Sequence, residues 1–586
     1  MIVARLLFGT VGLLLLAGGG RLVQIQVEDG SRLRAAADRQ HSVNVRIPAQ
    51  RGEILDLRGR VLAGAVRRDS VYVDPHMVAD ARFAAYSIAP TLRLDPAGLE
   101  RLLRENADKR FVWLKRRVDP AELVEFNKLR KQRDLRAFAV ETEWERTRPF
   151  GRLASHVIGF VGADERGLAG VEQACDQWLR GVDGQRSAIV DARNRRLDSD
   201  PASYTAPRDG ASIVLTLDVY LQQRVEEHLR TAVAKYNAVW GSVVLLDPRS
   251  GEVLAMASVP DYDPDEPLPK GADAAKSRAA LERVRNRAIS DSYEPGSIFK
   301  PFIAAPAVDE RLARLDESFT INGPSRQFGG RIINDTHAYD VLRLTEVISK
   351  SSNIGMGLLG SRLGNERLNR FVRMFGFGDV TGLGLPGEHS GLVLDFAKWT
   401  SFSTQSIPIG QEIAVTPIQL VSAFSALCND GLLYRPRIVR GVVAADGELL
   451  RDESEPIVVR RVLDPATARE FRMRALVETV TTGTGKQAAI DDYQVFGKTG
   501  TAQVARPNGR GYLTGAYVGS FVGGAPADAP RAAVIVSIYT QGQRQYYGGT
   551  VAAPTAGAIL AETLEYLRVP VEVGAASGVE LEVARP

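Results

Sequence analysis

Residues 242–258 read SVVLLDPRSGEVLAMAS, and this stretch decides the fold prediction. Two apolar runs of strand length flank the polar residues Pro-Arg-Ser-Gly at 248–251, a pattern that predicts an antiparallel hairpin. Each run is almost wholly apolar, which is typical of strands buried inside a domain. The sequence therefore predicts a buried hairpin at the centre of a folded unit.

Segments on both sides of this hairpin supply further strands and helices. Asp218 precedes a helical pattern and can cap its first turn. Strand-like runs follow much later, AYVGSFVGG at 516–524 and AAVIVSIYTQ at 532–541, and then a final helix over Thr555–Leu567. The apolar residues of the first helix recur at every fourth position and are Leu221, Val225 and Leu229. An antiparallel sheet with strands from both ends of a domain and helices between them predicts an α/β (α+β) fold.

A stretch dense in Pro, Ser and Gly, PASYTAPRDG at 201–210, marks a domain boundary. From about residue 40 to 205 the chain reads as strands and short helices, with a hairpin at 51–63 and no catalytic motif. We predict a mainly-β, elongated pedestal or interaction module there. The predicted organisation is an anchor at 1–23, this N-terminal pedestal or dimerisation-like domain at 24–205, a catalytic domain at 206–570 and a tail at 571–586.

The N-terminus contains a charge-free apolar run, Leu6 to Gly20, between Arg5 and Arg21. This run is slightly shorter than the about 20 residues that cross a bilayer, but arginines at its ends can reach the membrane interfaces. A cleaved signal peptide is the alternative, and the run lacks a clear A-x-A cleavage site. The sequence predicts one uncleaved transmembrane helix.

Composition excludes several classes of function. The chain has 74 Lys and Arg against 70 Asp and Glu, so no large basic excess exists to neutralise nucleic-acid phosphates. Its two cysteines, Cys175 and Cys428, belong to no CxxC or Cys/His cluster, and no HExxH occurs. We therefore expect no nucleic-acid partner, no metal and no cofactor.

Three short motifs occur in order along the predicted catalytic domain. They are Ser297-Ile-Phe-Lys300, Ser351-Ser352-Asn353 and Lys498-Thr499-Gly500-Thr501. The set S-x-x-K, S-D-N and K-T-G is the signature of penicillin-binding proteins and class A β-lactamases. Each motif alone is weakly specific, as the accidental Ser42-Val43-Asn44 shows. Their occurrence together, in an α/β context, favours a catalytic function.

The residue types in these motifs suit acyl transfer. On a helix, Lys300 lies one turn after Ser297 and can take the proton of the serine hydroxyl. Pro295-Gly296 predicts a sharp entry that leaves Ser297 at a helix N-terminus, and Pro301 predicts an irregular first turn. A second ammonium, that of Lys498, would help to keep Lys300 neutral.

The second and third motifs are expected to complete the site. Ser351 can pass a proton to the leaving amine, and Asn353, two residues on, can point its amide toward substrate. Thr499 offers a hydroxyl and Gly500 allows the close approach of a substrate backbone. Thr501 can give a backbone N–H to an oxyanion hole shared with Ser297.

Two glycine-rich segments resemble phosphate-binding motifs but fail on context. Gly382-Leu-Gly-Leu-Pro-Gly387 matches G-x-G-x-x-G, but Pro386 interrupts it and no helix is predicted to follow. Gly483-Thr-Gly-Lys486 lacks the first glycine of a P-loop, and Gln487 stands in place of Ser or Thr. Neither segment predicts a nucleotide site.

The chain resembles class B penicillin-binding proteins over nearly its whole length, from the anchor to about residue 570. The resemblance is carried by two sets of segments. In the catalytic domain they are VRNRAISD (284–291), EPGSIFKP (294–301), KSSNIG (350–355), IGQEIAVTPIQL (409–420), GKTGTAQ (497–503) and YYGGTVAAP (546–554). In the N-terminal part they are RGEILDLRG (51–59), ASHVIGFVG (154–162) and GLAGVEQACDQWLRG (167–181).

Ser-Ser-Asn at the second motif is similar to the cell-division type of this family, the FtsI or penicillin-binding protein 3 type. The resemblance implies a penicillin-binding transpeptidase domain at 206–570 and serine-type D,D-transpeptidation in septal cell-wall synthesis. It implies that Ser297 attacks the D-Ala-D-Ala bond of peptidoglycan stem peptides, lipid-linked or in nascent glycan, and that β-lactams trap this serine. It further implies an FtsW-like glycosyltransferase and other divisome proteins as partners.

The resemblance also implies that the chain is a single-pass protein of the cytoplasmic (inner) membrane, with its catalytic domain on the periplasmic side. Two alternatives remain open from the motifs. One is a hydrolase, either a D,D-carboxypeptidase or a β-lactamase, because both use the same acylation chemistry. The other is a non-catalytic division scaffold.

Overall fold

The computed structural model describes residues 2–24, 42–162, 164–190, 196–267, 274–506 and 511–571. The chain forms two compact units. The larger unit comprises Gly52–Gly64, Arg146–Leu179 and Ala211–Pro586, and the smaller comprises Met1–Arg51, Ala65–Glu145 and Arg180–Gly210. Two segments from the N-terminal part of the chain, Gly52–Gly64 and Arg146–Leu179, therefore belong to the same compact unit as the three motifs.

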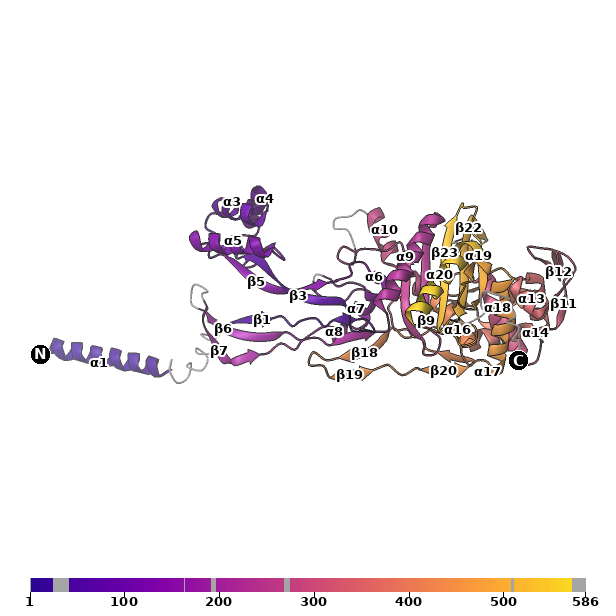
Figure 1. Cartoon of the computed structure of the whole chain (residues 1–586). Coiled ribbons are helices and arrows are strands. Elements are labelled where there is room, and N and C mark those ends of the chain that lie inside the picture. The colour runs from indigo at the N-terminus through magenta and orange to yellow at the C-terminus, as the bar shows by residue number, and fades with distance from the viewer. Residues whose placement is uncertain are drawn as a thin grey trace, which may run out of the picture. The chain divides into compact units, whose positions relative to one another are not determined.

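A five-stranded antiparallel sheet forms the centre of the larger unit (Figure 1). The predicted hairpin is confirmed, since Glu252 pairs with Asp247 and the two strands remain paired to Val259 and Gly241. The two strands that follow residue 510 add to it as predicted: one has the predicted bounds, 532–541, and the other extends beyond 516–524 at both ends. In spatial order the strands are β10 (Glu252–Val259), β9 (Trp240–Asp247), β23 (Ala532–Gln541), β22 (Tyr512–Ala525) and β21 (Phe496–Ala505).

Helices cover both faces of this sheet, which is why its strands are apolar at consecutive positions. Val243 and Leu245 pack with α9 (Val219–Lys235) and α20 (Ala553–Tyr566). Side chains alternate along a strand, so Val244 and Leu246 belong to the other core. That core is built with α12 (Pro301–Asp309), α14 (Asn353–Met374) and α16 (Pro417–Cys428). The predicted cap is present, because the Asp218 side chain accepts hydrogen bonds from the N–H groups of Tyr220 and Leu221.

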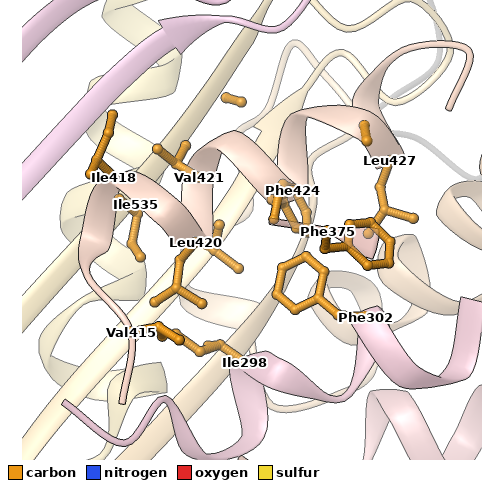
Figure 2. Close-up of a cluster of buried hydrophobic side chains, with 14 of the residues drawn as sticks. Ile298, Phe302, Phe375, Val415, Ile418, Leu420, Val421, Phe424, Leu427 and Ile535 are labelled. Carbon is orange, nitrogen blue, oxygen red and sulfur yellow. The ribbon is translucent and has the colours of Figure 1, made fainter. Parts of the chain in front are cut away.

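Helix α16 lies at the centre of the second core, and every one of its residues is buried. Figure 2 shows its apolar side chains between Ile535 of β23 and Ile298 and Phe302 of the Ser297 segment. The ring of Phe302 also lies 5.2 Å from that of Phe375. The Ser297 segment is thus fixed to the sheet through a continuous apolar core.

A second sheet of the larger unit joins its early and late segments. Strand β2 (Ile54–Leu55) pairs antiparallel with the start of β3 (Val61–Val73), which confirms the hairpin predicted at 51–63. On its other side β2 pairs in parallel with β8 (Ser212–Leu215), followed by β18 (Val439–Val443) and β19 (Leu449–Asp452).

Shorter elements complete the larger unit. The helices are α6 (Ser155–Ile158), α7 (Gly170–Ala174), α8 (Asp176–Leu179), α10 (Ala274–Val284), α11 (Arg287–Ser290), η3 (Gly296–Phe299), α13 (Leu344–Ser349), η4 (Phe396–Lys398), α15 (Ser403–Ser406), η5 (Ile407–Ile409), α17 (Pro465–Phe471), η6 (Arg472–Leu476), α18 (Val477–Thr481), η7 (Lys486–Ala488) and α19 (Gly548–Val551). The strands are β11 (Ser318–Thr320), β12 (Ser325–Phe328), β13 (Arg331–Asn334), β14 (Val341–Arg343), β15 (Leu392–Val393), β16 (Ile413–Ala414), β17 (Leu432–Tyr434) and β20 (Val458–Arg461).

The smaller unit contains helices as well as strands, so the prediction of a mainly-β module is only partly right. One core places three helices against the continuation of β3 and its neighbours, with Phe126 and Phe138 fully buried. A separate three-stranded sheet has the order β1-β6-β7. The elements are α1 (Ile2–Val23), β1 (Ser42–Ile47), η2 (Pro75–Met77), α3 (Ala81–Leu92), α4 (Pro96–Glu105), β4 (Val112–Lys115), α5 (Pro120–Gln132), β5 (Phe138–Thr147), β6 (Gly184–Val190) and β7 (Arg196–Thr205).

Helix α1 forms over the apolar N-terminal run. Among the residues that the structure describes, no helix meets the combined length and hydropathy needed to cross a membrane, so the predicted anchor is not confirmed. Most of the predicted tail, from residue 572 onward, lies outside the described residues.

The core beneath the Ser297 segment generates a stability prediction. Phe302→Ala removes a fully buried ring that packs against Phe299, Phe375 and Phe377. We expect the free energy of unfolding to fall by about 3–5 kcal/mol, because the cavity cannot fully collapse. Denaturant unfolding of the full chain measures this change. Phe396→Ala, at a ring that is 49% exposed, is the matched control and should change stability little; equal losses in the two variants would contradict this packing.

Candidate active site

Ser297 lies in a short 3-10 turn, η3, which leads into α12 at Pro301. Pro301 has no N–H to continue a regular helix backward, so the predicted irregular first turn is confirmed. Ser297 is half-buried, whereas Ile298, Phe299 and Lys300 are buried. The turn therefore presents the serine hydroxyl at a surface while the residues after it anchor the segment in the core.

Glycines make this turn possible. Gly296 has a φ of +59°, and its N–H donates to the carbonyl of Gly410 at 3.1 Å. A Cβ on Gly410 would come within 2.2 Å of the Gly296 carbonyl oxygen. The segment around Gly410 is thus pressed against the turn, and any side chain at that position would displace it.

The Lys300 ammonium contacts the second motif. Its Nζ donates to the carbonyl oxygen of Ser351 at 2.5 Å, to Ser351 Oγ at 3.2 Å and to Asn353 Oδ1 at 2.9 Å. These are three acceptors for three N–H donors. Among the described residues no hydrogen bond joins Lys300 to Ser297 Oγ, so proton exchange between these two residues stays a prediction. A neutral Lys300 would have only two N–H groups and a lone pair free to accept a proton.

Ser351 connects the two lysines of the site. Lys498 Nζ donates to Ser351 Oγ at 2.9 Å, so the hydroxyl lies between both amines. The backbone of Ser351 has a φ of +64°, an uncommon conformation for a residue with a side chain. Because both lone pairs of the hydroxyl are taken by lysines, its own hydrogen is available to donate.

Burial changes the proton affinity of both lysines. Lys300 and Lys498 are fully buried. Burial lowers the pKa of Lys300 to about 7, against the opposing influence of the nearby Asp335 carboxylate. Burial, and then the charge of Lys300, hold the pKa of Lys498 well below its usual range. A substantial fraction of Lys300 is therefore neutral near pH 7, as a general base requires.

Asp335 is a site residue that no motif signalled. Its Oδ1 accepts from the backbone N–H groups of Asn353 at 2.5 Å and Ile354 at 3.0 Å, and its Oδ2 accepts from Ser352 Oγ at 2.5 Å. The carboxylate thus caps the start of α14 and fixes the Ser351–Asn353 loop. Only the fold brings it there, from a loop 18 residues before Asn353.

The Asn353 amide is held by hydrogen bonds within the site. Its Oδ1 accepts from Lys300 and its Nδ2 donates to the carbonyl of Asn334 at 3.0 Å. Both ends of the amide thus have internal partners, because the loop places them between the lysine and β13. The residue nevertheless lines the cavity beside Ser297.

The third motif lies on β21, which is the last strand of its sheet. Side chains alternate, so Lys498 and Gly500 face the Ser297 turn while Thr499 and Thr501 face the opposite side. A Cβ on Gly500 would lie 2.9 Å from Ile298 Cγ2 and 3.0 Å from the Pro295 carbonyl. Gly500 is thus needed for the approach of the Ser297 turn to the strand, and the close approach of a substrate backbone stays a prediction.

The threonine hydroxyls have partners within the protein. Thr499 Oγ1 lies 2.6 Å from Thr484 Oγ1, a contact that sequence reasoning missed because the two are far apart in the chain. Thr501 Oγ1 accepts from the backbone N–H of Gly548 at 3.0 Å. These bonds hold the motif strand against α19 and the loop before η7.

A cavity of about 130 Å³ opens at Ser297. Its lining includes the serine, Asn353 and Thr501, so the fold brings one residue from each of the three motifs to the same place. Its remaining walls include two polar side chains that sequence reasoning did not single out, Glu294 and Gln411. Within the described ranges no cluster of His, Cys, Asp and Glu is arranged to hold a metal ion.

Comparison with protein families gives two matches. Residues 241–561 match the penicillin binding protein transpeptidase domain. Residues 46–215 match the penicillin-binding protein dimerisation domain. Together the two matches extend over most of residues 46–561.

Named relatives and solved structures agree with these matches. The chain is 33% identical over 560 residues to the peptidoglycan D,D-transpeptidase FtsI of Escherichia coli, covering 94% of this chain and 89% of that protein. It is 34% identical over 525 residues to the probable peptidoglycan D,D-transpeptidase PenA of Neisseria gonorrhoeae, covering 89% and 85%. The crystal structure of penicillin binding protein 3 from Mycobacterium tuberculosis in complex with aztreonam superposes with a TM-score of 0.68 at 28% identity, covering 92% of this chain and 100% of that one.

The buried lysine generates a prediction about pH. We expect the rate of Ser297 acylation to rise as pH increases through about 7, because the neutral fraction of Lys300 rises over that range. Lys300→Arg keeps a positive charge that cannot be lost and should slow acylation by about a hundredfold to ten-thousandfold. Stopped-flow acylation with a chromogenic β-lactam from pH 5.5 to 9 measures both effects. An unchanged pH profile in the arginine variant would contradict Lys300 as the base.

The approach of β21 to the Ser297 turn generates a second prediction. Gly500→Ala forces Ile298 and the Pro295 carbonyl away, and we expect acylation to slow by about tenfold to a hundredfold through misplacement of Ser297. Gly330→Ala is the matched control, because its Cβ would meet nothing nearer than 3.7 Å. The same acylation assay at one pH compares the two variants; equal rates would show that the contact does not position Ser297.

Proposed function

The chain belongs to the penicillin-binding protein transpeptidase family, and from that premise we propose that it is a peptidoglycan D,D-transpeptidase acting through a Ser297 acyl-enzyme. The observation that carries this proposal is the joint position of Ser297, two buried lysines and the shared Ser351 hydroxyl. A serine nucleophile, a base with a lowered pKa and a hydroxyl able to relay a proton are the groups that amide acyl transfer needs.

In the first step Ser297 Oγ attacks the carbonyl carbon of the penultimate D-Ala of a donor stem peptide. The hydroxyl proton passes to neutral Lys300, and the backbone N–H groups of Ser297 and Thr501 stabilise the tetrahedral oxyanion. The C–N bond then breaks, and the leaving D-Ala amine takes a proton from the Ser351 hydroxyl, which Lys300 replaces. The product is an ester between Ser297 and the donor peptide.

In the second step an acceptor amine attacks this ester. The amine gives up one proton through the same lysine and serine relay, and Ser297 Oγ leaves as a hydroxyl. The cross-linked peptide and the free enzyme result. The outer edge of β21 supports this use, since an edge strand offers backbone groups on which an extended peptide can align.

We extend the proposal to inhibition, cellular role and location. β-Lactams are proposed to acylate Ser297, with the aztreonam complex of the Mycobacterium tuberculosis protein as support. Ser-Ser-Asn and the likeness to FtsI support a role in septal cell-wall synthesis, with an FtsW-like glycosyltransferase and other divisome proteins as partners. The apolar run Leu6–Gly20 supports a single transmembrane anchor in the inner membrane, with the catalytic domain outside the cytoplasm.

The nucleophile assignment generates the decisive experiment. The parent chain should be labelled by a fluorescent penicillin at Ser297, with the adduct mapped by mass spectrometry, and should cross-link donor and acceptor peptides. Ser297→Ala should lose both activities, whereas Ser318→Ala, at an exposed serine of β11, should keep them.

The products separate the remaining hypotheses. Cross-linked peptide supports the transpeptidase, water-released peptide alone would show a hydrolase, and no product from a folded parent chain would show a scaffold. Labelling of Ser297→Ala as strong as that of the parent would mean that another residue is the nucleophile.

A further inference from the structure

A second cavity of the larger unit lies apart from the Ser297 site. Its volume is about 230 Å³, several times the about 30 Å³ that a water molecule takes in the liquid. The two cavities share no lining residue. One wall is the start of the glycine-rich segment, Gly382–Gly384, and another is the run of residues 435–439, with Arg451 and Glu453 beside it.

The cavity contains buried guanidinium groups with unused donors. Arg437 is 2% exposed, and its Nη1 donates to the carbonyl of Glu453. Within the described part of the chain, Nε and Nη2 of Arg437 and Nε of Arg435 are buried and have no hydrogen-bond partner. Buried donors are nearly always satisfied in folded proteins, and leaving them unpaired is costly. Donors on two different side chains that line one cavity therefore indicate an acceptor that enters from outside.

The charges around the cavity indicate the sign of that acceptor. Glu252 Oε1 lies 3.4 Å from Arg437 Nη2 and 3.5 Å from Arg440 Nη1, so one carboxylate serves two arginines at long range. Arg451 pairs with Glu453. Arg435 has no ion pair among the described residues, and the remaining carboxylate nearby, Asp452, is exposed on β19. Positive charge is thus in excess around the cavity, and Arg437 carries part of it at a fully buried position, where an unbalanced charge is costly.

The glycines of the opposite wall keep the cavity open. Gly382 has a φ of +80°, and a Cβ there would come within 3.1 Å of Arg435 Cδ. Gly384, with a φ of +87°, has no atom within 4 Å of its Cβ position. The segment therefore packs against the Arg435 side chain, and because its glycines have no side chains, their backbone forms this wall of the cavity.

We propose that this arginine pocket, defined by Arg435, Arg437 and Arg451, binds a phosphate-class oxyanion, a phosphomonoester or a pyrophosphate. Guanidinium N–H groups match phosphate oxygens in pairs, and a tetrahedral group can accept from several arginines that approach on different sides. A carboxylate has only two oxygens in one plane and fits donors from two separate side chains less well. The phosphate belongs either to a soluble molecule or to a lipid headgroup. The site goes beyond the transpeptidase function and does not rest on it.

Titration of the full chain with inorganic pyrophosphate, at constant ionic strength, tests the proposal by calorimetry. We expect saturable binding to the parent chain and about tenfold weaker binding to Arg435→Gln, the loss of one charge-assisted contact. Arg314→Gln is the matched control, since it removes an equal charge from an exposed arginine that pairs with Asp316. Penicillin acylation should be the same in all three proteins, and a cooperative thermal unfolding transition in each should show that all three are folded.

Binding to lipid vesicles distinguishes a lipid headgroup from a soluble molecule as the source of the phosphate. Phosphatidic acid vesicles carry a phosphomonoester headgroup, and phosphatidylcholine vesicles serve as the reference. Tighter binding of the phosphatidic acid vesicles to the parent than to Arg435→Gln would support a lipid headgroup, whereas pyrophosphate binding alone would support a soluble ligand. The proposal is overturned if neither pyrophosphate nor the vesicles bind saturably, or if Arg435→Gln and Arg314→Gln bind pyrophosphate equally tightly. It is also overturned if acetate displaces bound pyrophosphate as well as inorganic phosphate does at the same concentration.

Discussion

The contact of two buried lysines with one serine hydroxyl is the constraint on which the catalytic unit depends. Lys300 and Lys498 both donate to Ser351 Oγ, and neither is exposed. Two ammonium groups at this separation cannot both stay charged cheaply, so the site holds at least one neutral amine near pH 7. The chemistry follows from this electrostatic conflict, which supplies a base without any titratable histidine.

The rest of the fold holds the two lysines buried and close to the Ser351 hydroxyl. Lys498 is fixed by β21 within the sheet, and Lys300 by a turn whose neighbours Ile298 and Phe302 belong to the core around α16 (Figure 2). The Ser351 loop is fixed by the Asp335 carboxylate. A looser scaffold would let the lysines separate or admit water, and their pKa values would return toward that of an exposed lysine.

Local patterns predicted the elements of this site better than their contacts. The hairpin at 242–258, the helix after Asp218 and the irregular turn at Pro301 depend on residues adjacent in sequence, and all are confirmed. Asp335, and Thr484 beside Thr499, act across loops whose course no periodicity reveals. The contact of Gly500 with Ile298 was not predicted either, because the distance between a strand and a turn is a property of the packed core.

Lysine and arginine resolve the same problem of buried positive charge in different ways. At the Ser297 site the amines can lose a proton, so burial lowers the pKa of Lys300 and leaves a neutral amine that can accept the proton of the serine. A guanidinium cannot lose its proton at any physiological pH, even where burial lowers its pKa, as it does for Arg437. The excess positive charge in the arginine pocket must therefore be balanced by an anion, or it lowers the stability of the folded chain. The buried donors of Arg435 and Arg437 have no hydrogen-bond partner among the described residues, and an anion from outside the chain would supply both the acceptors and the opposite charge.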